Sequence, residues 1–178
     1  MKYVATLLTT LLLLTGVSLP ASAAEEPKSP AVITVNIVNS KAEIIGTATI
    51  TGQVDAVHIH LEAAGLPPGT HGIHFHAVGK CEAPDFTSAG AHFNPTHKEH
   101  GFNNPKGFHS GDLLNIEVGK DGKVNTIVKS TSVTFTKGQP NSIIQKDGLA
   151  LVIHEKADDY KTDPAGNSGN RIACGVIK

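Results

Sequence analysis

The sequence contains no tryptophan, only two tyrosines and one methionine, and no excess of either charge. Its 15 basic and 16 acidic side chains nearly cancel, so no strong positive field points to nucleic acid or anionic lipid as a partner. Helical periodicity is also missing over any useful length, which argues against a helical fold. With 39% hydrophobic and 17% charged residues, the chain is too apolar to be disordered and too polar for a multi-span membrane protein.

The first residues have the pattern of a secretory signal. Lys2 precedes an apolar, leucine-rich stretch, and residues 20–23 offer the small side chains of a cleavage site. A membrane anchor is the alternative, but the apolar stretch is short for a bilayer span. We expect a signal peptide over 1–23, a flexible linker over 24–30 and one domain over 31–178. The mature protein is then exported, without a membrane span, and is secreted, periplasmic or associated with the cell envelope.

Short alternating segments, separated by glycine and proline, predict β-strands. These segments cover residues 31–38, 42–51, 54–61, 71–78, 113–118, 123–131, 149–154 and 171–177. Residues 79–108 and 155–170 show no period, and loops this long in a compact domain usually carry function. We predict an all-β fold, namely an antiparallel Greek-key sandwich or barrel of about eight strands with two long functional loops.

Two cysteines, Cys81 and Cys174, lie outside the predicted signal peptide. In an exported protein, two cysteines most simply form one disulfide. Such a bond would join the middle of the chain to its last residues. Two free thiols, or two thiol ligands of a metal ion, are the alternatives.

Ten histidines are the most unusual feature of the composition, and they indicate metal binding. His74 and His76 are two residues apart in a predicted strand, so both side chains lie on one face and can share an ion. His154 ends another apolar strand. Further candidate ligands in and after the long loop are His92, His97, His100, His109 and Asp112. Imidazole favours copper and zinc, and zinc also accepts a carboxylate, so the sequence predicts a transition-metal site.

His58 and His60 have the same spacing as His74 and His76. No other candidate ligand lies close to this pair in the sequence. We therefore interpret this pair as a solvent-facing strand edge, and the sequence leaves open whether it binds metal.

Five motifs follow one another along the chain: HGIHFH at 71–76, AGAHFNP at 89–95, HSGDL at 109–113, LVIHE at 151–155 and GNRIACGVI at 169–177. In order and nearly in spacing they resemble the motifs of the copper/zinc superoxide dismutase family, in its exported bacterial type. The resemblance runs from about Ala31 to Lys178. It implies an oxidoreductase that converts the small anion superoxide to oxygen and hydrogen peroxide.

The resemblance also implies two ligand sets that share one residue. One copper ion per chain would be held by His74, His76, His92 and His154. One zinc ion per chain would be held by His92, His100, His109 and Asp112. His92 would bridge both ions as an imidazolate, because two cations invert the ordinary pKa of an imidazole.

Other matching residues would support this chemistry. Asp158 would hydrogen-bond one ligand histidine of each metal and fix its orientation. Cys81 and Cys174 match the disulfide of the family. Arg171 would hold the substrate beside the copper through charge-assisted hydrogen bonds. The copper would be alternately reduced and oxidised, His92 would supply one proton, and the zinc would be structural. A non-catalytic metal-binding or copper-delivery protein of the same fold is the main alternative, and a structural adhesion sandwich is another.

Some positions depart from the family pattern. Loop 155–170 is shorter than in the animal cytosolic members, and Lys161 is its nearest basic candidate for steering superoxide. Ala165 stands where those members have a threonine. The chain ends at Lys178 without the longer tail that helps the eukaryotic dimer, so the sequence leaves monomer or homodimer open. His97 has no family role and is expected to be a solvated loop residue.

Overall fold

A computed structural model describes residues 31–178, so the predicted signal peptide and linker lie outside the described residues. The described chain forms nine strands and one short 3-10 helix. They are β1 (Val32–Asn39), β2 (Ile44–Gly52), β3 (Val57–Ala64), β4 (Gly69–His71), β5 (Ile73–His76), η1 (Thr87–Ala89), β6 (Ile116–Val118), β7 (Lys123–Ser130), β8 (Leu149–His154) and β9 (Arg171–Ile177).

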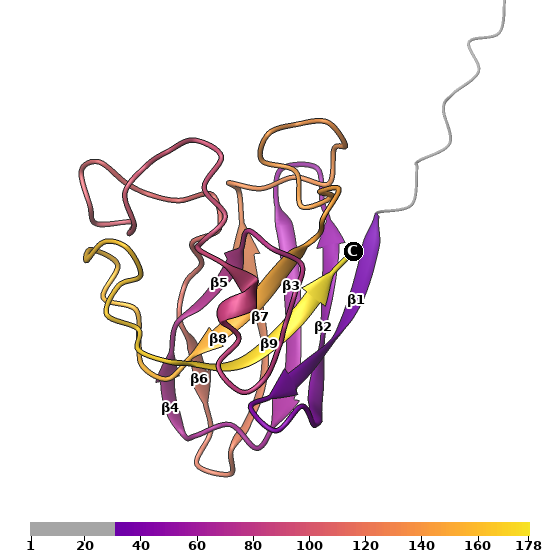
Figure 1. The fold of residues 1–178 in the computed structure, drawn as a ribbon, viewed down its shortest axis with the longest axis vertical. Helices are drawn as coiled ribbons and strands as arrows, with labels where there is room; N and C mark the ends of the chain where they lie inside the picture. Colours follow the sequence, from indigo (N-terminus) through magenta and orange to yellow (C-terminus); the bar gives the residue numbers. More distant parts are fainter. Residues whose placement is uncertain (1–30) are drawn as a thin grey trace, which may run out of the picture.

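Seven strands form one curled antiparallel sheet in the order β5-β8-β9-β1-β2-β3-β7, and β4 pairs with β6 in a small second sheet (Figure 1). The prediction of an all-β antiparallel fold is confirmed. The segment predicted as one strand over 71–78 is divided at Gly72, because His71 pairs with Ile116 in the small sheet whereas Ile73 pairs with Ile153 in the large one. The chain therefore changes sheets immediately before the first candidate ligands.

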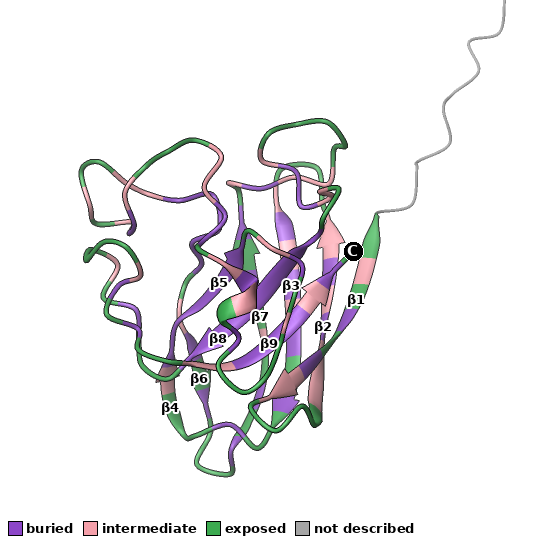
Figure 2. Ribbon diagram, in the orientation of Figure 1, coloured by how far each residue is buried: buried purple, intermediate pink, exposed green. Residues whose placement is uncertain are grey.

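The hydrophobic core lies inside the curled sheet and is supplied by alternating residues. In β3, Val57, Ile59 and Leu61 are buried, whereas His58 and His60 on the opposite face are partly exposed (Figure 2). Apolar residues at every second position thus direct one face inward, as the period of a strand requires. The expectation that the two histidines mark a strand edge is wrong, because β3 pairs with β2 on one side and with β7 on the other.

Strand β8 is buried along its whole length, which explains its almost continuous apolar sequence. Leu149, Leu151 and Ile153 belong to the main core. The alternate residues of the strand pack in a second, smaller cluster under the loop that follows β5, together with Phe86, Ala89 and Cys174. The predicted disulfide between Cys81 and Cys174 is confirmed and fastens this loop to β9, across a sequence separation of 93 residues.

Two long loops, one after β5 and one between β8 and β9, lie on the same side of the barrel, at the left of Figure 1. The first contains η1 and otherwise little regular structure, as its composition predicted. Among residues 31–178, no helix is long and apolar enough to cross a membrane. The first loop, β5 and the end of β8 carry the candidate ligands, and the second loop carries Asp158.

Candidate metal centre

Four buried histidines from three elements meet beside the barrel. Strand β5 supplies His74 and His76, the last residue of β8 is His154, and the long loop adds His92, which bridges to His76 as an isolated β-pair. One ligand nitrogen from each ring lies within 4.8 Å of those of the other three. The structure thus brings together the four residues that the sequence analysis grouped as copper ligands, and this quartet is called the first set below.

Hydrogen bonds at Nδ1 assign the tautomers of two of these rings, those of His76 and His154. The Nδ1 of His76 lies 2.9 Å from the carbonyl oxygen of Gly90, and the Nδ1 of His154 lies 3.3 Å from that of Gly169. A carbonyl only accepts, so each Nδ1 carries the proton and each Nε2 carries a lone pair. The two Nε2 atoms are 3.3 Å apart, so two acceptors face each other, an arrangement that a shared cation would stabilise.

The other two rings leave a buried nitrogen without a partner. The Nε2 of His74 donates to Asp158 Oδ2 at 2.7 Å, and the Nδ1 of His92 lies 3.0 Å from Asp112 Oδ1. Their remaining nitrogens, His74 Nδ1 and His92 Nε2, are buried and find no hydrogen-bond partner among residues 31–178. Buried polar atoms are nearly always paired, and an unpaired one calls for an explanation such as an ion. Both atoms belong to the first set, so their environment fits a metal ion.

A second set surrounds one carboxylate oxygen. Three ring Nδ1 atoms approach Asp112 Oδ1, from His92 at 3.0 Å, His100 at 3.0 Å and His109 at 3.3 Å. The other oxygen, Oδ2, accepts the backbone N–H groups of Gly101 and His109, each at 3.0 Å, which fixes the carboxylate. Three imidazoles and one carboxylate, all buried, are donors of the kinds that zinc accepts in a tetrahedral site. His92 belongs to both sets, with a different ring nitrogen facing each.

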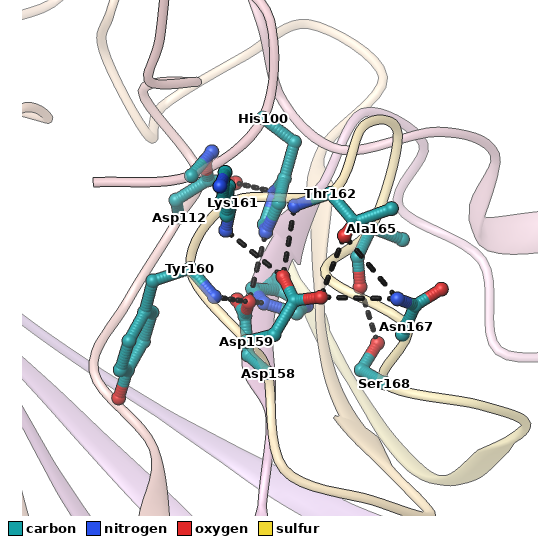
Figure 3. Close-up of polar contacts among 12 residues, drawn as sticks. His100, Asp112, Asp158, Asp159, Tyr160, Lys161, Thr162, Ala165, Asn167 and Ser168 are labelled. Atoms are coloured by element: carbon teal, nitrogen blue, oxygen red, sulfur yellow. Dashed lines mark hydrogen bonds and ion pairs between the residues drawn. The ribbon is translucent and has the colours of Figure 1, made fainter. Parts of the chain in front are cut away.

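Asp158 connects the two sets, and Figure 3 shows its contact with His100 of the second set. Its Oδ2 accepts the proton of His74 Nε2, and its Oδ1 lies 3.0 Å from His100 Nε2 and accepts the backbone N–H of Tyr160 at 2.6 Å. One carboxylate therefore orients one imidazole of each set, as outer carboxylates commonly do around metals. This geometry agrees with the position that the sequence analysis gave to Asp158.

The residues that hold Asp158 in place were not identified from the sequence. The side-chain amide of Asn115 accepts from the Asp158 backbone N–H and donates to its carbonyl, both at 2.9 Å. Gly166 has a φ of 61°, and a side chain there would overlap the Asp158 carboxylate. Gly166 itself was a usable signal, because glycine is common where the backbone has a positive φ or approaches another group closely. Nothing in the sequence near Asn115 indicated its contact with a residue 43 positions away.

No role was predicted for His71 either, although it is the first residue of the first motif. It is buried, and its Nδ1 and Nε2 lie 2.8 Å from the carbonyl oxygens of His154 and Pro67. The ring thus connects the backbone of a first-set histidine to the turn before β4. By contrast His97 is exposed, as predicted for a solvated loop residue, and so is Lys161.

Arg171 begins β9, opposite His154 in the strand register. Its half-buried guanidinium donates two hydrogen bonds of 2.7 Å to the carbonyl oxygens of Phe86 and Gly90. The Gly90 carbonyl also accepts from His76 Nδ1, so Arg171 and a first-set histidine share one acceptor. This common anchor holds a positive charge next to the first set.

A family model described as copper/zinc superoxide dismutase (SODC) matches residues 44–177. The chain belongs to the copper/zinc superoxide dismutase family. The family implies copper and zinc as its metals, in agreement with the two histidine-rich sets.

Two curated relatives cover most of the chain. "Superoxide dismutase [Cu-Zn] 1" of Aquifex aeolicus is 49% identical over 158 residues, which are 88% of this chain and 91% of that protein. "Superoxide dismutase-like protein YojM" of Bacillus subtilis is 48% identical over 145 residues, which are 80% of this chain and 74% of that protein. The family thus includes similar proteins named as dismutases, which are oxidoreductases, and one named only as dismutase-like.

Solved structures of the family share the fold. A superoxide dismutase-like protein from Bacillus subtilis superposes with a TM-score of 0.80 at 46% identity, covering 83% of this chain and all of that chain. The copper/zinc superoxide dismutase from Brucella abortus gives a TM-score of 0.68 at 28% identity, with the same coverage. Both likenesses thus cover most of this chain.

Burial keeps the first set neutral. It lowers the pKa of His92 to about 4 and that of His154 to about 3, and it lowers the pKa values of His74 and His76 as well. Neutral imidazole is the form that binds metal, so these residues remain competent ligands in mildly acidic solution. Burial acts in the same direction on His100, but its hydrogen bonds to Asp112 and Asp158 outweigh this effect and raise its pKa to about 9.

These pKa values predict how the stability of the metal-free protein depends on pH. Between about pH 6.5 and pH 4, unfolded histidines bind protons that His92 and His154 do not bind in the fold, so acid favours unfolding. His100 has the opposite sign, because the stability that it contributes is complete below pH 6.5 and is lost as the pH rises through about 9. The unfolding free energy of the metal-free protein, measured with urea after removal of metal by a chelator, should therefore be greatest near neutral pH.

The variant His154→Gln provides the matched control. It removes one group of lowered pKa, so its stability should fall less steeply below pH 6.5 than that of the parent. A parent whose unfolding free energy stays level from pH 6.5 to pH 4 would contradict this explanation.

Proposed function

We propose that this chain is a superoxide dismutase that converts superoxide to oxygen and hydrogen peroxide. In this proposal one copper ion is held by the first set, and one zinc ion by the second. The observation that carries the proposal is the convergence of four buried imidazole nitrogens, two of which, His74 Nδ1 and His92 Nε2, have no partner among residues 31–178. Bound copper would supply one-electron oxidation and reduction of successive superoxide anions, and redox-inert zinc would contribute charge and structure.

Arg171 would bind and orient the substrate. Two carbonyl acceptors fix its guanidinium beside the first set, and donors that these bonds do not use remain for an anion. A planar guanidinium forms charge-assisted bonds in a fixed direction, which a lysine ammonium would not do equally well. The arginine would thus bring superoxide to the open side of the four histidines.

His92 would carry a proton for the product. Its Nδ1 faces the second set and its Nε2 faces the first, so Nε2 is the atom that can hold a proton when it is not coordinated. A cation held by the second set would withdraw charge from the ring, so a proton at Nε2 could pass to a more basic product. Asp158 would keep the rings of His74 and His100 in their tautomers throughout the cycle.

We further propose that the protein acts outside the cytosol after removal of the signal peptide over 1–23. The disulfide between Cys81 and Cys174 supports this location, because such bonds persist in oxidising compartments. The same bond restrains the loop that presents the carbonyls of Phe86 and Gly90 to Arg171. In an oxidising compartment the disulfide would persist and would keep these carbonyls in place beside Arg171.

Variants of Arg171 test its role in substrate access. Outside the predicted signal peptide the chain has a small excess of acidic residues, so a local positive charge is needed to attract superoxide. We expect Arg171→Ala to keep both metals but to lose much of kcat/KM, with Arg171→Lys intermediate and Arg171→Glu worst. The rate of the alanine variant should also depend less on salt, since the Debye length falls from about 10 Å at 0.1 M to about 3 Å at 1 M.

Stopped-flow measurement of superoxide decay at matched copper content, across ionic strength, checks this series. The exposed Lys161 serves as the control, and Lys161→Ala should change the rate less than Arg171→Ala does. Equal rates of the alanine and glutamate variants at low salt would show that Arg171 does not face the substrate path.

A metal-binding or copper-delivery protein of the same fold is the second candidate function. The Bacillus subtilis relative is named only as dismutase-like, and this name supports a carrier as the alternative. A carrier would bind copper without converting superoxide, whereas a dismutase must bind copper and convert superoxide. The presence of Arg171 beside four intact histidines supports the enzyme.

A further inference from the structure

The outer face of β3 presents a second pair of histidines, away from the two buried sets. Val57, Ile59 and Leu61 of this strand point into the core, so the partly exposed His58 and His60 point out of the barrel. Strand β3 lies within the sheet between β2 and β7, and its backbone is therefore held on both sides. The backbone positions of the two histidines are therefore fixed by the sheet.

The hydrogen bonds of His60 leave one ring nitrogen free to act as a ligand. Its Nε2 lies 2.8 Å from Asn125 Oδ1 on β7, and the amide nitrogen of Asn125 donates to Glu62 Oε1 at 2.9 Å. Because the amide nitrogen faces the carboxylate, its oxygen faces His60, so Nε2 must carry the proton. Nδ1 then carries the lone pair. The chain from carboxylate to amide to imidazole is the kind of outer support that orients a metal-binding histidine.

The spacing of the pair suits chelation of one ion. Alternate residues of a strand point to the same face, and this chain contains an internal precedent, because His74 and His76 are also two apart in a strand and bring ligand nitrogens within 4.8 Å of each other. Copper(II) is the divalent first-row ion that imidazole binds most strongly, with zinc weaker. We propose that His58 and His60 form a surface site for a divalent copper or zinc ion, with water completing its coordination.

Neighbouring charges tune this site in opposite directions. Glu62 lies two residues further along the same face, and its negative charge favours a cation nearby. Lys129 on β7 pairs in register with His58, and its positive charge opposes binding. We expect Lys129→Gln to tighten metal binding, because the change removes repulsion and leaves the backbone pairing in place.

Titration with Cu²⁺ of the protein already loaded with copper and zinc tests the proposal. Equilibrium dialysis counts the ions bound, and electron paramagnetic resonance reports nitrogen ligands of the added copper. The parent should bind one additional copper per chain, and His58→Ala and His60→Ala should each lose it while superoxide turnover stays unchanged. His97→Asn, which removes a histidine from an exposed loop, should keep it. Asn125→Ala should weaken binding about tenfold, through loss of the support to His60.

Three outcomes would overturn the proposal. The first is that no additional copper binds to the loaded parent. The second is an additional copper that persists in His60→Ala. The third is an additional copper that appears together with an equal amount of released zinc, because that ion has entered the buried centre. Melting curves of the two alanine variants should match the parent, since both side chains lie outside the core.

Discussion

Replacing His154 with alanine should abolish superoxide turnover while zinc stays bound. His154 belongs to the first set only, and the Nδ1 of its ring lies against the carbonyl oxygen of Gly169 rather than against Asp112 of the second set. Three of the four proposed copper ligands would remain after the change, and the ring that is lost is the one whose Nε2 lies 3.3 Å from that of His76. Copper content should therefore fall sharply, whereas the zinc content should remain close to one per chain.

The local fold should survive this substitution. The carbonyl oxygen of His154 receives the hydrogen bond of His71, and a main-chain acceptor is kept in the alanine variant. Metal analysis by mass spectrometry, together with the superoxide assay, gives the measurement, and His97→Asn gives the control for loss of a histidine outside both sets. If the alanine variant kept full turnover, His154 would not be a copper ligand.

Removing the metals and the disulfide together should lower the melting temperature by about 15–35 °C. In the chain-entropy model, a bond that closes a loop of this length contributes about 4–5 kcal/mol. Metal that binds only the folded state adds about 4 kcal/mol when its concentration is 1,000 times the dissociation constant. For a domain of this size, each kcal/mol shifts the melting temperature by roughly 2–4 °C.

The loop after β5 is the reason for this dependence. Between η1 and β6 it has few buried apolar side chains, so the second set and the bond from Cys81 to Cys174 contribute much of what holds it in place. Calorimetry after chelation alone, reduction alone and both treatments separates the two contributions, and each single treatment should give a smaller shift. His97→Asn should melt close to the parent. A melting curve unchanged by both treatments would show that the loop is held by other contacts.

Much of the barrel and of both ligand sets could be predicted from the sequence. Alternating apolar residues located the strands, and the predicted limits of β8 and β9 coincide with those in the structure. The division of the candidate ligands into two sets came from the resemblance to a known family, because local structure determines the relative positions of only a few of them. His74 and His76 are the simplest case, since two residues of one strand face have a fixed separation.

The remaining features depend on how distant segments meet. The contact of Asn115 with Asp158 requires the paths of both long loops, and neither residue carries a local signal for it. Likewise the division of the predicted strand at Gly72 follows from pairing with two different sheets, which no local pattern records. The position of β3 inside the sheet reflects strand order, so the alternation of His58 and His60 predicted their exposed face but not their distance from an edge.

Reconstitution with copper tests the central proposal most directly. Metal-free protein is first loaded with zinc and then titrated with copper, while bound copper and superoxide turnover are measured on the same samples. Turnover should rise in proportion to copper and reach a plateau at one copper and one zinc per chain. Copper that binds to one equivalent without turnover would contradict the account, and would assign the buried histidines to a metal carrier instead.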